Sequence, residues 1–170
     1  MVLIFKTKPL LNTMVTYAIV WTASDINEQK LICRKQKLDP WKTLRMGIVA
    51  TFVVAPQVFT WLRVAEKLFP GKTLRIVIKK VISEQILFTP AAILCFYAAT
   101  SVLERKDPVK EIKEKSLKTY GTGLMWWPFV QSVNFRFVPH QYKPVFVAGA
   151  SFIWSNFLSF MKEDHIHQHS

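Results

Sequence analysis

Side chains able to act as nucleophiles, general bases or metal ligands are scarce in this sequence. The two cysteines, Cys33 and Cys95, are too few for a disulfide framework and lack metal-ligand spacing, so we interpret both as apolar fillers. Three of the four histidines, His165, His167 and His169, stand near the C-terminus, and no nucleophile has a nearby base. We therefore predict that the protein is not an enzyme and that it has no catalytic residue, cofactor or metal.

Acidic residues are also few, 11 against 23 lysines and arginines, which gives a formal net charge of +12. Such a charge is common in nucleic-acid-binding proteins, whose basic residues gather on one face. Here the basic residues fill the gaps between long apolar runs, as anchors for anionic lipid headgroups do. With 51% hydrophobic residues and a mean hydropathy of +0.19, the sequence predicts a membrane protein that binds anionic lipids and no nucleic acid.

Targeting segments at the N-terminus have little support. The apolar residues 1–5 are too short for the core of a signal peptide, and no arginine precedes Arg34, as an arginine-rich presequence would require. We expect targeting to an organelle by internal sequence.

Long stretches without charge predict membrane-spanning helices. Met46–Leu62 has 17 uncharged residues and Gln85–Leu103 has 19, close to the about 20 that cross a hydrocarbon core. Apolar surfaces also run over residues 9–30, around Trp127 and over Val145–Met161. The predicted fold is therefore all-α, a multi-pass helical membrane bundle with about four membrane-spanning segments.

The remaining segments complete this domain. Residues 104–118 place apolar side chains on one side and lysines on the other, which predicts an interfacial amphipathic helix, loosely joined by Gly121 and Gly123 to the helix that follows. We expect one membrane domain over residues 1–163 and a polar tail over 164–170. For the alternating tail histidines we favour a disordered tail over a metal site.

Local signals mark the ends of several helices. Asp39-Pro40 and Asp107-Pro108 each predict a helix start, with the acid as cap and the proline in the first turn. Residues 69–72, with the sequence Phe-Pro-Gly-Lys, predict a turn between two helices. Pro56 is expected to break its helix, and Trp41 and Trp61 are expected to lie at the two membrane interfaces.

Three side-chain amides stand where apolar surroundings are expected. Trp127, Gln131 and Asn134 follow at i, i+4 and i+7, so both amides lie under a tryptophan on one helix face. Gln57 follows Pro56 in a second apolar helix. Because unpaired amides are costly in apolar surroundings, these residues either hold helices together or line a polar pathway, and both alternatives stay open.

Three charged residues also stand near the expected membrane interior, and each has more than one possible placement. Glu84, beside Gln85, starts a spanning segment, where it either pairs with a base such as Lys80 or an arginine, or lies among the headgroups. Asp25 either folds inward or ends a solvated helix. Arg136 lies on a different face from Asn134 and either lines the pathway, favouring anions, or extends to the headgroups, which we favour.

The pattern of Trp127, Pro128, Gln131, Asn134, Phe135, Val138 and Pro139 resembles the C-terminal signature of the Mpv/PMP family of small peroxisomal and mitochondrial membrane proteins. The pattern continues through Tyr142, Lys143, Trp154, Leu158 and Ser159. The middle of the chain also resembles the family, most of all its Mpv-like protein branch, at Pro56, Trp61, Leu68, Pro70, Gly71, Glu84, Gln85 and Pro90. Lys143 stands where the family commonly has arginine, so a bidentate contact is lost there.

The resemblance implies a multi-pass protein of the mitochondrial inner membrane or the peroxisomal membrane that acts in organelle homeostasis and reactive-oxygen metabolism. It also implies a weakly selective channel for small solutes, formed within one chain or by a homo-oligomer. Asp25, Gln57, Glu84, Gln85, Gln131, Asn134 and Arg136 are the candidates for lining the pore or packing the helices. The alternative is a structural or anionic-lipid-binding membrane protein without transport activity.

Overall fold

The computed structural model describes residues 8–32 and 37–167, and within these the side chains of all but residues 31–32 and 157–167. This part of the chain is helical and contains no strand, so the all-α prediction is confirmed. Its helices join into five rods: α2 (Pro9–Asn27) with the π-helical turn η1 (Glu28–Ile32); α3 (Pro40–Val49), η2 (Ala50–Val54) and α4 (Ala55–Leu68); α5 (Leu74–Ser83), η3 (Glu84–Phe88) and α6 (Thr89–Glu104); α7 (Pro108–Phe137); and, after the 3₁₀ turn η4 (His140–Tyr142), α8 (Lys143–His167).

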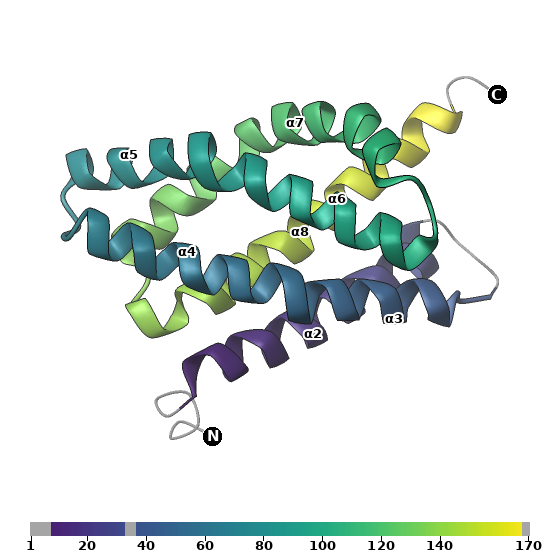
Figure 1. The fold of residues 1–170 in the computed structure, drawn as a ribbon, viewed down its shortest axis with the longest axis horizontal. Helices are drawn as coiled ribbons and strands as arrows, with labels where there is room; N and C mark the ends of the chain where they lie inside the picture. The colour runs from purple at the N-terminus through teal and green to yellow at the C-terminus, as the bar shows by residue number, and fades with distance from the viewer. Residues whose placement is uncertain (1–7, 33–36, 168–170) are drawn as a thin grey trace.

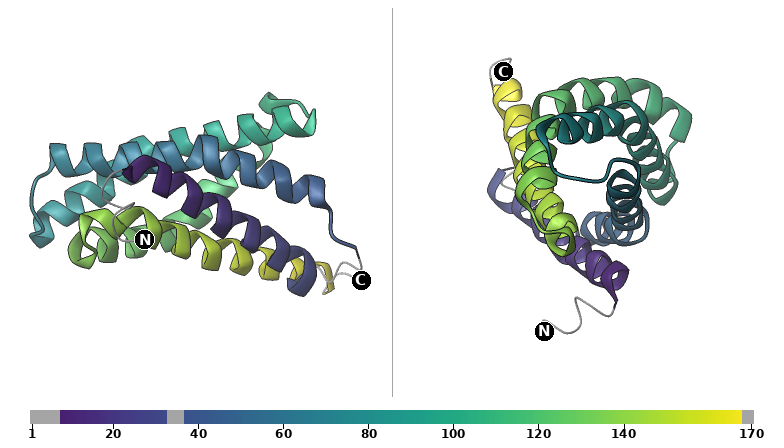
Figure 2. Two further views of the ribbon diagram at one scale, coloured as in Figure 1. Left: turned by 90° about the horizontal axis from the view of Figure 1, so that it is seen from below. Right: turned by 90° about the vertical axis from the view of Figure 1, so that its left-hand side faces the viewer.

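The five rods lie roughly along one long axis, and successive rods run in opposite directions (Figure 1). Helix α6 packs on α7, α2 packs on both α8 and α3, and α5 packs on α7. Seen along the axis, the rods surround a common interior, with α2 and α8 on one side and α7 on another (Figure 2). Residues far apart in the sequence therefore project toward the same central axis.

Prolines do not break the second and third rods. Pro56 and Pro90 each follow a π-helical turn by two residues, η2 and η3 respectively. Proline has no N–H to donate and its ring crowds the carbonyl four residues earlier, and a wider turn relieves both problems without ending the helix. The expected break at Pro56 is therefore wrong, and the rod continues to Leu68.

The predicted helix starts and turn are confirmed. The Asp39 carboxylate accepts hydrogen bonds from the backbone N–H groups of Trp41 and Lys42, both at 3.0 Å. Asp107 caps α7 in the same way, at 2.9 Å from the N–H of Val109. In the turn between α4 and α5, Gly71 has a φ of +112°, a conformation that side chains disfavour.

The boundary expected at Gly121 and Gly123 is absent. Residues 104–118 do not form a separate interfacial helix, because all but the first few belong to α7, which runs unbroken for 30 residues. At about 1.5 Å per residue this helix is about 45 Å long, more than the about 30 Å of a hydrocarbon core. The Tyr97 hydroxyl on α6 meets the Thr119 hydroxyl at 2.7 Å, which ties this half of α7 to the bundle.

Two rods are long and apolar enough to cross a membrane, Pro40–Leu68 and Leu74–Glu104, by length and composition among the described residues. Only 6% of the residues in the most apolar window of the second rod are fully buried. Trp41 is 69% exposed, whereas Trp61 is 9% exposed and stacks on Phe88 at 5.3 Å. The expectation that Trp61 lies at an interface is therefore wrong, because it packs in the core.

The structure also differs from two smaller expectations, which concern the cysteines and the C-terminal tail. Cys95 is exposed on α6 and so is not a core filler, while Cys33 lies outside the described residues. Helix α8 continues to His167, so the backbone of residues 164–167 is helical where a disordered tail was expected, and His169 lies beyond the described part.

We predict that Gly71→Ala destabilises the protein by about 1–3 kcal/mol. The alanine would have to keep the disfavoured φ of +112°, and its Cβ would lie 2.9 Å from the Ile76 side chain. Gly121→Ala is the matched control, since nothing lies within 4 Å of its added Cβ and alanine favours helix. Thermal unfolding of the purified protein in detergent measures both. Equal effects of the two substitutions would contradict the strained turn.

Candidate functional site

A cavity of about 320 Å³ lies inside the bundle and is lined by side chains from all five rods. Its polar lining includes Asp25, Gln57, Glu84 and Gln131, four of the candidates named from the sequence. Most of the remaining lining is apolar or aromatic, and includes Trp127 and Trp154. The cavity therefore combines an apolar body with a few inward-facing polar groups, which is the usual composition of a site for small molecules.

The helix face of Trp127, Gln131 and Asn134 points inward as predicted. Gln131 is 2% exposed and its amide donates to Glu84 Oε1 at 2.6 Å. Asn134 is fully buried and donates to Gln131 Oε1 at 2.8 Å. The two amides thus form a short chain of hydrogen bonds that ends on a carboxylate of the third rod.

Glu84 has a different partner from the one expected. It is 3% exposed, which places it inside the bundle and away from lipid headgroups. Lys80, one turn earlier, bonds instead to Glu66 at 2.9 Å and to the backbone carbonyl of Gly71 at 3.1 Å. Of the alternatives considered for Glu84, pairing with Lys80 is therefore wrong, because the Lys80 ammonium group is bound to Glu66.

Several buried polar atoms near this cavity lack a hydrogen-bond partner among the described residues. They include the Tyr17 hydroxyl and the Trp21 indole nitrogen on α2. Glu84 Oε2 and the Trp61 indole nitrogen are also unpaired by strict hydrogen-bond geometry, but the two groups are neighbours, and the indole is close enough to stabilise the carboxylate. Buried polar groups are normally paired with protein or water, so these atoms favour a polar occupant in the cavity.

A network around Asp25 lies at one end of the cavity, and Asp25 is 3% exposed and so folds inward. The carboxylate accepts from Gln29 at 2.7 Å and from Thr43 at 2.5 Å, and Lys42 lies 3.1 Å from it. Lys42 also lies 3.2 Å from Glu28. The end of α2 is thereby joined to the start of α3.

The opposite end of the bundle holds a second ionic cluster. Lys80 on α5 and Lys143 on α8 both bind the carboxylate of Glu66 on α4. Both ammonium groups also lie over the Phe135 ring, at 5.3 and 5.1 Å from its centre. The two lysines are 0% and 1% exposed, so the cluster is buried together with Phe135 beyond Asn134. Lys143 therefore makes a fixed carboxylate contact despite lacking the fork of arginine.

The other predicted residues lie outside the cavity lining. Gln85 is buried with both amide atoms unpaired among described residues, and its carbonyl accepts from Tyr120 at 3.1 Å. Arg136 is exposed and donates to the carbonyl of Lys72 in the α4–α5 turn, so it does not line the pathway. Of the remaining signature residues, Pro128 lies within α7, and Val138 and Pro139 end that helix.

Sequence reasoning missed part of the site. Tyr17 and Trp21 were considered only as part of an apolar surface, yet they stand four residues apart and share a helix face with Ser24 and Asp25, which periodicity alone could have indicated. The link between α2 and α8 was not foreseeable in this way. There the hydroxyls of Ser24 and Ser155 meet across 131 residues of sequence. In the described part of the chain, no three histidine, cysteine or acidic residues gather where a metal would bind.

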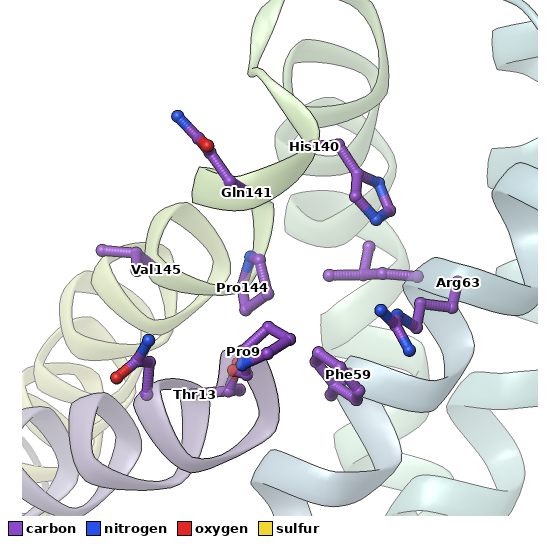
Figure 3. Close-up of a pocket in the computed structure, with 10 residues that line it drawn as sticks. Pro9, Thr13, Phe59, Arg63, His140, Gln141, Pro144 and Val145 are labelled. Carbon is purple, nitrogen blue, oxygen red and sulfur yellow. The ribbon is translucent and has the colours of Figure 1, made fainter. Parts of the chain in front are cut away.

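A smaller pocket of about 250 Å³ opens at the end of the bundle that contains η4 (Figure 3). Its polar lining consists of Asn12, Thr13, Arg63, His140 and Gln141. Arg63 lies 4.7 Å above the Phe59 ring. None of the residues predicted as site candidates lines this pocket.

We predict that Gln131→Leu destabilises the protein by about 2 kcal/mol, because it leaves the buried Glu84 carboxylate and the Asn134 amide without their partner. Gln57→Leu is the control, with a change within about 0.5 kcal/mol, since no hydrogen bond to its half-buried side chain occurs among the described residues. Thermal unfolding in detergent compares the two. If both variants unfold alike, the amide chain contributes nothing to stability.

Comparison with known proteins identifies relatives along nearly the whole chain. A model of the Mpv17 / PMP22 family matches residues 101–159. The chain is 32% identical to an Mpv17-like protein of Xenopus laevis over 96% of this chain and 81% of that protein. It is 33% identical to Protein sym-1 of Neurospora crassa over 91% of this chain and 92% of that protein. No solved structure matches the chain significantly.

The name of a third relative states the membrane in which that protein lies. The Mitochondrial inner membrane protein Mpv17 of Caenorhabditis elegans is 31% identical over 95% of this chain and 92% of its own length. The resemblance stated from the C-terminal signature is thus confirmed by relatives that match well beyond that signature. The chain belongs to the Mpv17 / PMP22 family and is a protein of the mitochondrial inner membrane or the peroxisomal membrane.

Proposed function

We propose that this protein is a weakly selective channel for small solutes, with the central cavity as part of the pathway. The observation that carries the proposal is a cavity of about 320 Å³ beside buried polar atoms that have no hydrogen-bond partner among the described residues, above all the Tyr17 hydroxyl and the Trp21 indole nitrogen. A cavity that served only packing would be filled with apolar groups or would pair its polar ones. The resemblance favours a role in organelle homeostasis and reactive-oxygen metabolism.

About four membrane-spanning segments fit this function. Two rods qualify by length and composition, Pro40–Leu68 and Leu74–Glu104. The other rods pack lengthwise against them, so a bilayer that surrounds these two also surrounds α2, α7 and α8 over part of their length. Exposed apolar side chains on those helices support contact with lipid: Leu11, Val15 and Ile19 on α2, Met125 and Phe129 on α7, and Ile153 on α8.

We infer that the two ionic clusters limit passage through the proposed channel. The Asp25 network lies at one end of the interior and the cluster of Glu66, Lys80 and Lys143 at the other. Passage through both ends requires both clusters to separate, and ion pairs with a partly exposed member are suited to this because water replaces the lost contact. Glu66, whose side chain is 24% exposed, is such a member.

Other parts of the proposal concern partners. We propose that membrane lipids and small solutes, rather than nucleic acid, are the ligands and that the protein has no enzymatic activity. A homo-oligomer is compatible with the exposed apolar surface, and it would place further cavities side by side.

Single-channel recording in planar bilayers tests the channel. We expect discrete openings, with conductance lowered by about half or more in Gln131→Leu and Glu84→Gln, because both residues line the cavity. Glu104→Gln is the matched control on the same rod as Glu84, since Glu104 pairs with Lys106 at 2.6 Å outside the cavity. Its conductance should equal that of the unmodified protein.

A second candidate function is a structural protein that binds anionic lipid. The pocket at η4 favours it, because Arg63 and His140 converge there without any acidic residue in the lining (Figure 3). Bilayers that stay silent with folded, inserted protein would overturn the channel. In that case, loss of binding to anionic vesicles in Arg63→Ala would support the lipid-binding scaffold.

A further inference from the structure

The charge of the central cavity is opposite to that of the whole protein. Asp25, Glu28 and Glu84 line it, and no lysine, arginine or histidine does so among the described residues. This holds although the chain carries a formal net charge of +12. Lys42 is the ion-pair partner of both Asp25 and Glu28. The lining therefore carries an excess of negative charge, and the polar side chains next to Glu84 are neutral: the amide of Gln131, which donates to it, and the indole of Trp61.

Aromatic rings form much of the cavity wall. On one side the rings follow one another in contact: Tyr17 lies 6.4 Å from Trp21, Trp21 lies 5.9 Å from Phe96, and Phe96 lies 5.4 Å from Tyr97. All four line the cavity, and Phe88, Trp127 and Trp154 complete the lining elsewhere. The faces of aromatic rings carry partial negative charge, so such a wall attracts cations that shed water easily.

We propose that the cavity binds an organic cation, a small monovalent ammonium compound with an apolar body, between the Glu84 carboxylate and the wall of Tyr17, Trp21, Phe96 and Tyr97. This inference rests on the proposed channel function and names the class of solute. The Glu84 carboxylate, which has neutral neighbours and no basic residue in the cavity lining, neutralises the ammonium charge, while the rings replace its weak hydration shell. An inorganic ion such as Na⁺ binds water too strongly to gain from such rings.

The far end of the bundle carries the opposite charge. Lys80 and Lys143 share the single carboxylate of Glu66 beyond Asn134 and Phe135. A cation in the cavity meets this surplus of positive charge as a barrier. The cation is therefore held on the Glu84 side of this cluster.

Binding of benzyltrimethylammonium to the purified full-length protein in detergent tests the proposal, with tryptophan fluorescence as the signal because Trp21, Trp127 and Trp154 line the cavity. The neutral isostere with carbon in place of nitrogen, neopentylbenzene, controls for apolar binding. We expect the cation to bind about tenfold more tightly than the neutral compound. Glu84→Gln should remove that difference, and Glu104→Gln should preserve it.

Trp21→Leu provides a second variant that keeps all charges and should weaken cation binding more than neutral binding. Equal affinity for the cation and its neutral isostere in the unmodified protein, or an unchanged preference in folded Glu84→Gln, would overturn the proposal. Cation binding without single-channel openings contradicts the channel alone, whereas openings without a preference for the cation contradict only this inference.

Discussion

The hydrogen bond from Gln131 to Glu84 is the contact on which the arrangement of the interior depends. It joins the third rod to α7 at a level where both side chains are almost completely buried. A bilayer offers no water to a polar group, so a carboxylate and two amides at this depth are stable only if they satisfy one another or face a polar space. Their pairing fixes the rotation of both rods, and the neighbouring aromatic side chains then surround the cavity.

The two ionic clusters act at a distance from this centre and on different helices. Asp25, Lys42 and Thr43 fasten α2 to α3, while Glu66, Lys80 and Lys143 fasten α4, α5 and α8. Each cluster has three or more members. The first contains one partly exposed residue that forms an ion pair, Lys42, and the second contains Glu66 in the same role. The interior thus lies between two polar clusters, and each cluster holds a different set of helices together.

Much of the fold could be predicted from the sequence, since uncharged runs and acidic caps depend on neighbouring residues alone. The capped starts at Asp39 and Asp107 and the turn at Gly71 are local features of this kind. The face of Gln131 and Asn134 also followed from helical spacing. The partners of Glu84, Lys80 and Lys143 did not follow, because they depend on which rods become neighbours. The 30-residue length of α7 was missed because tertiary packing outweighs the low helix propensity of two glycines.

The π-helical turn η2 changes the phase of the second rod. Buried positions along this rod step from Ala50 to Ala55, then to Val58, Leu62 and Ala65. The first step is five residues, where a regular helix would take three or four. One additional residue in a turn rotates everything after it by about 100° relative to an uninterrupted helix. The halves before and after η2 therefore follow separate hydrophobic periods, and a relative lacking this single residue would present a different stripe of side chains to the same interior.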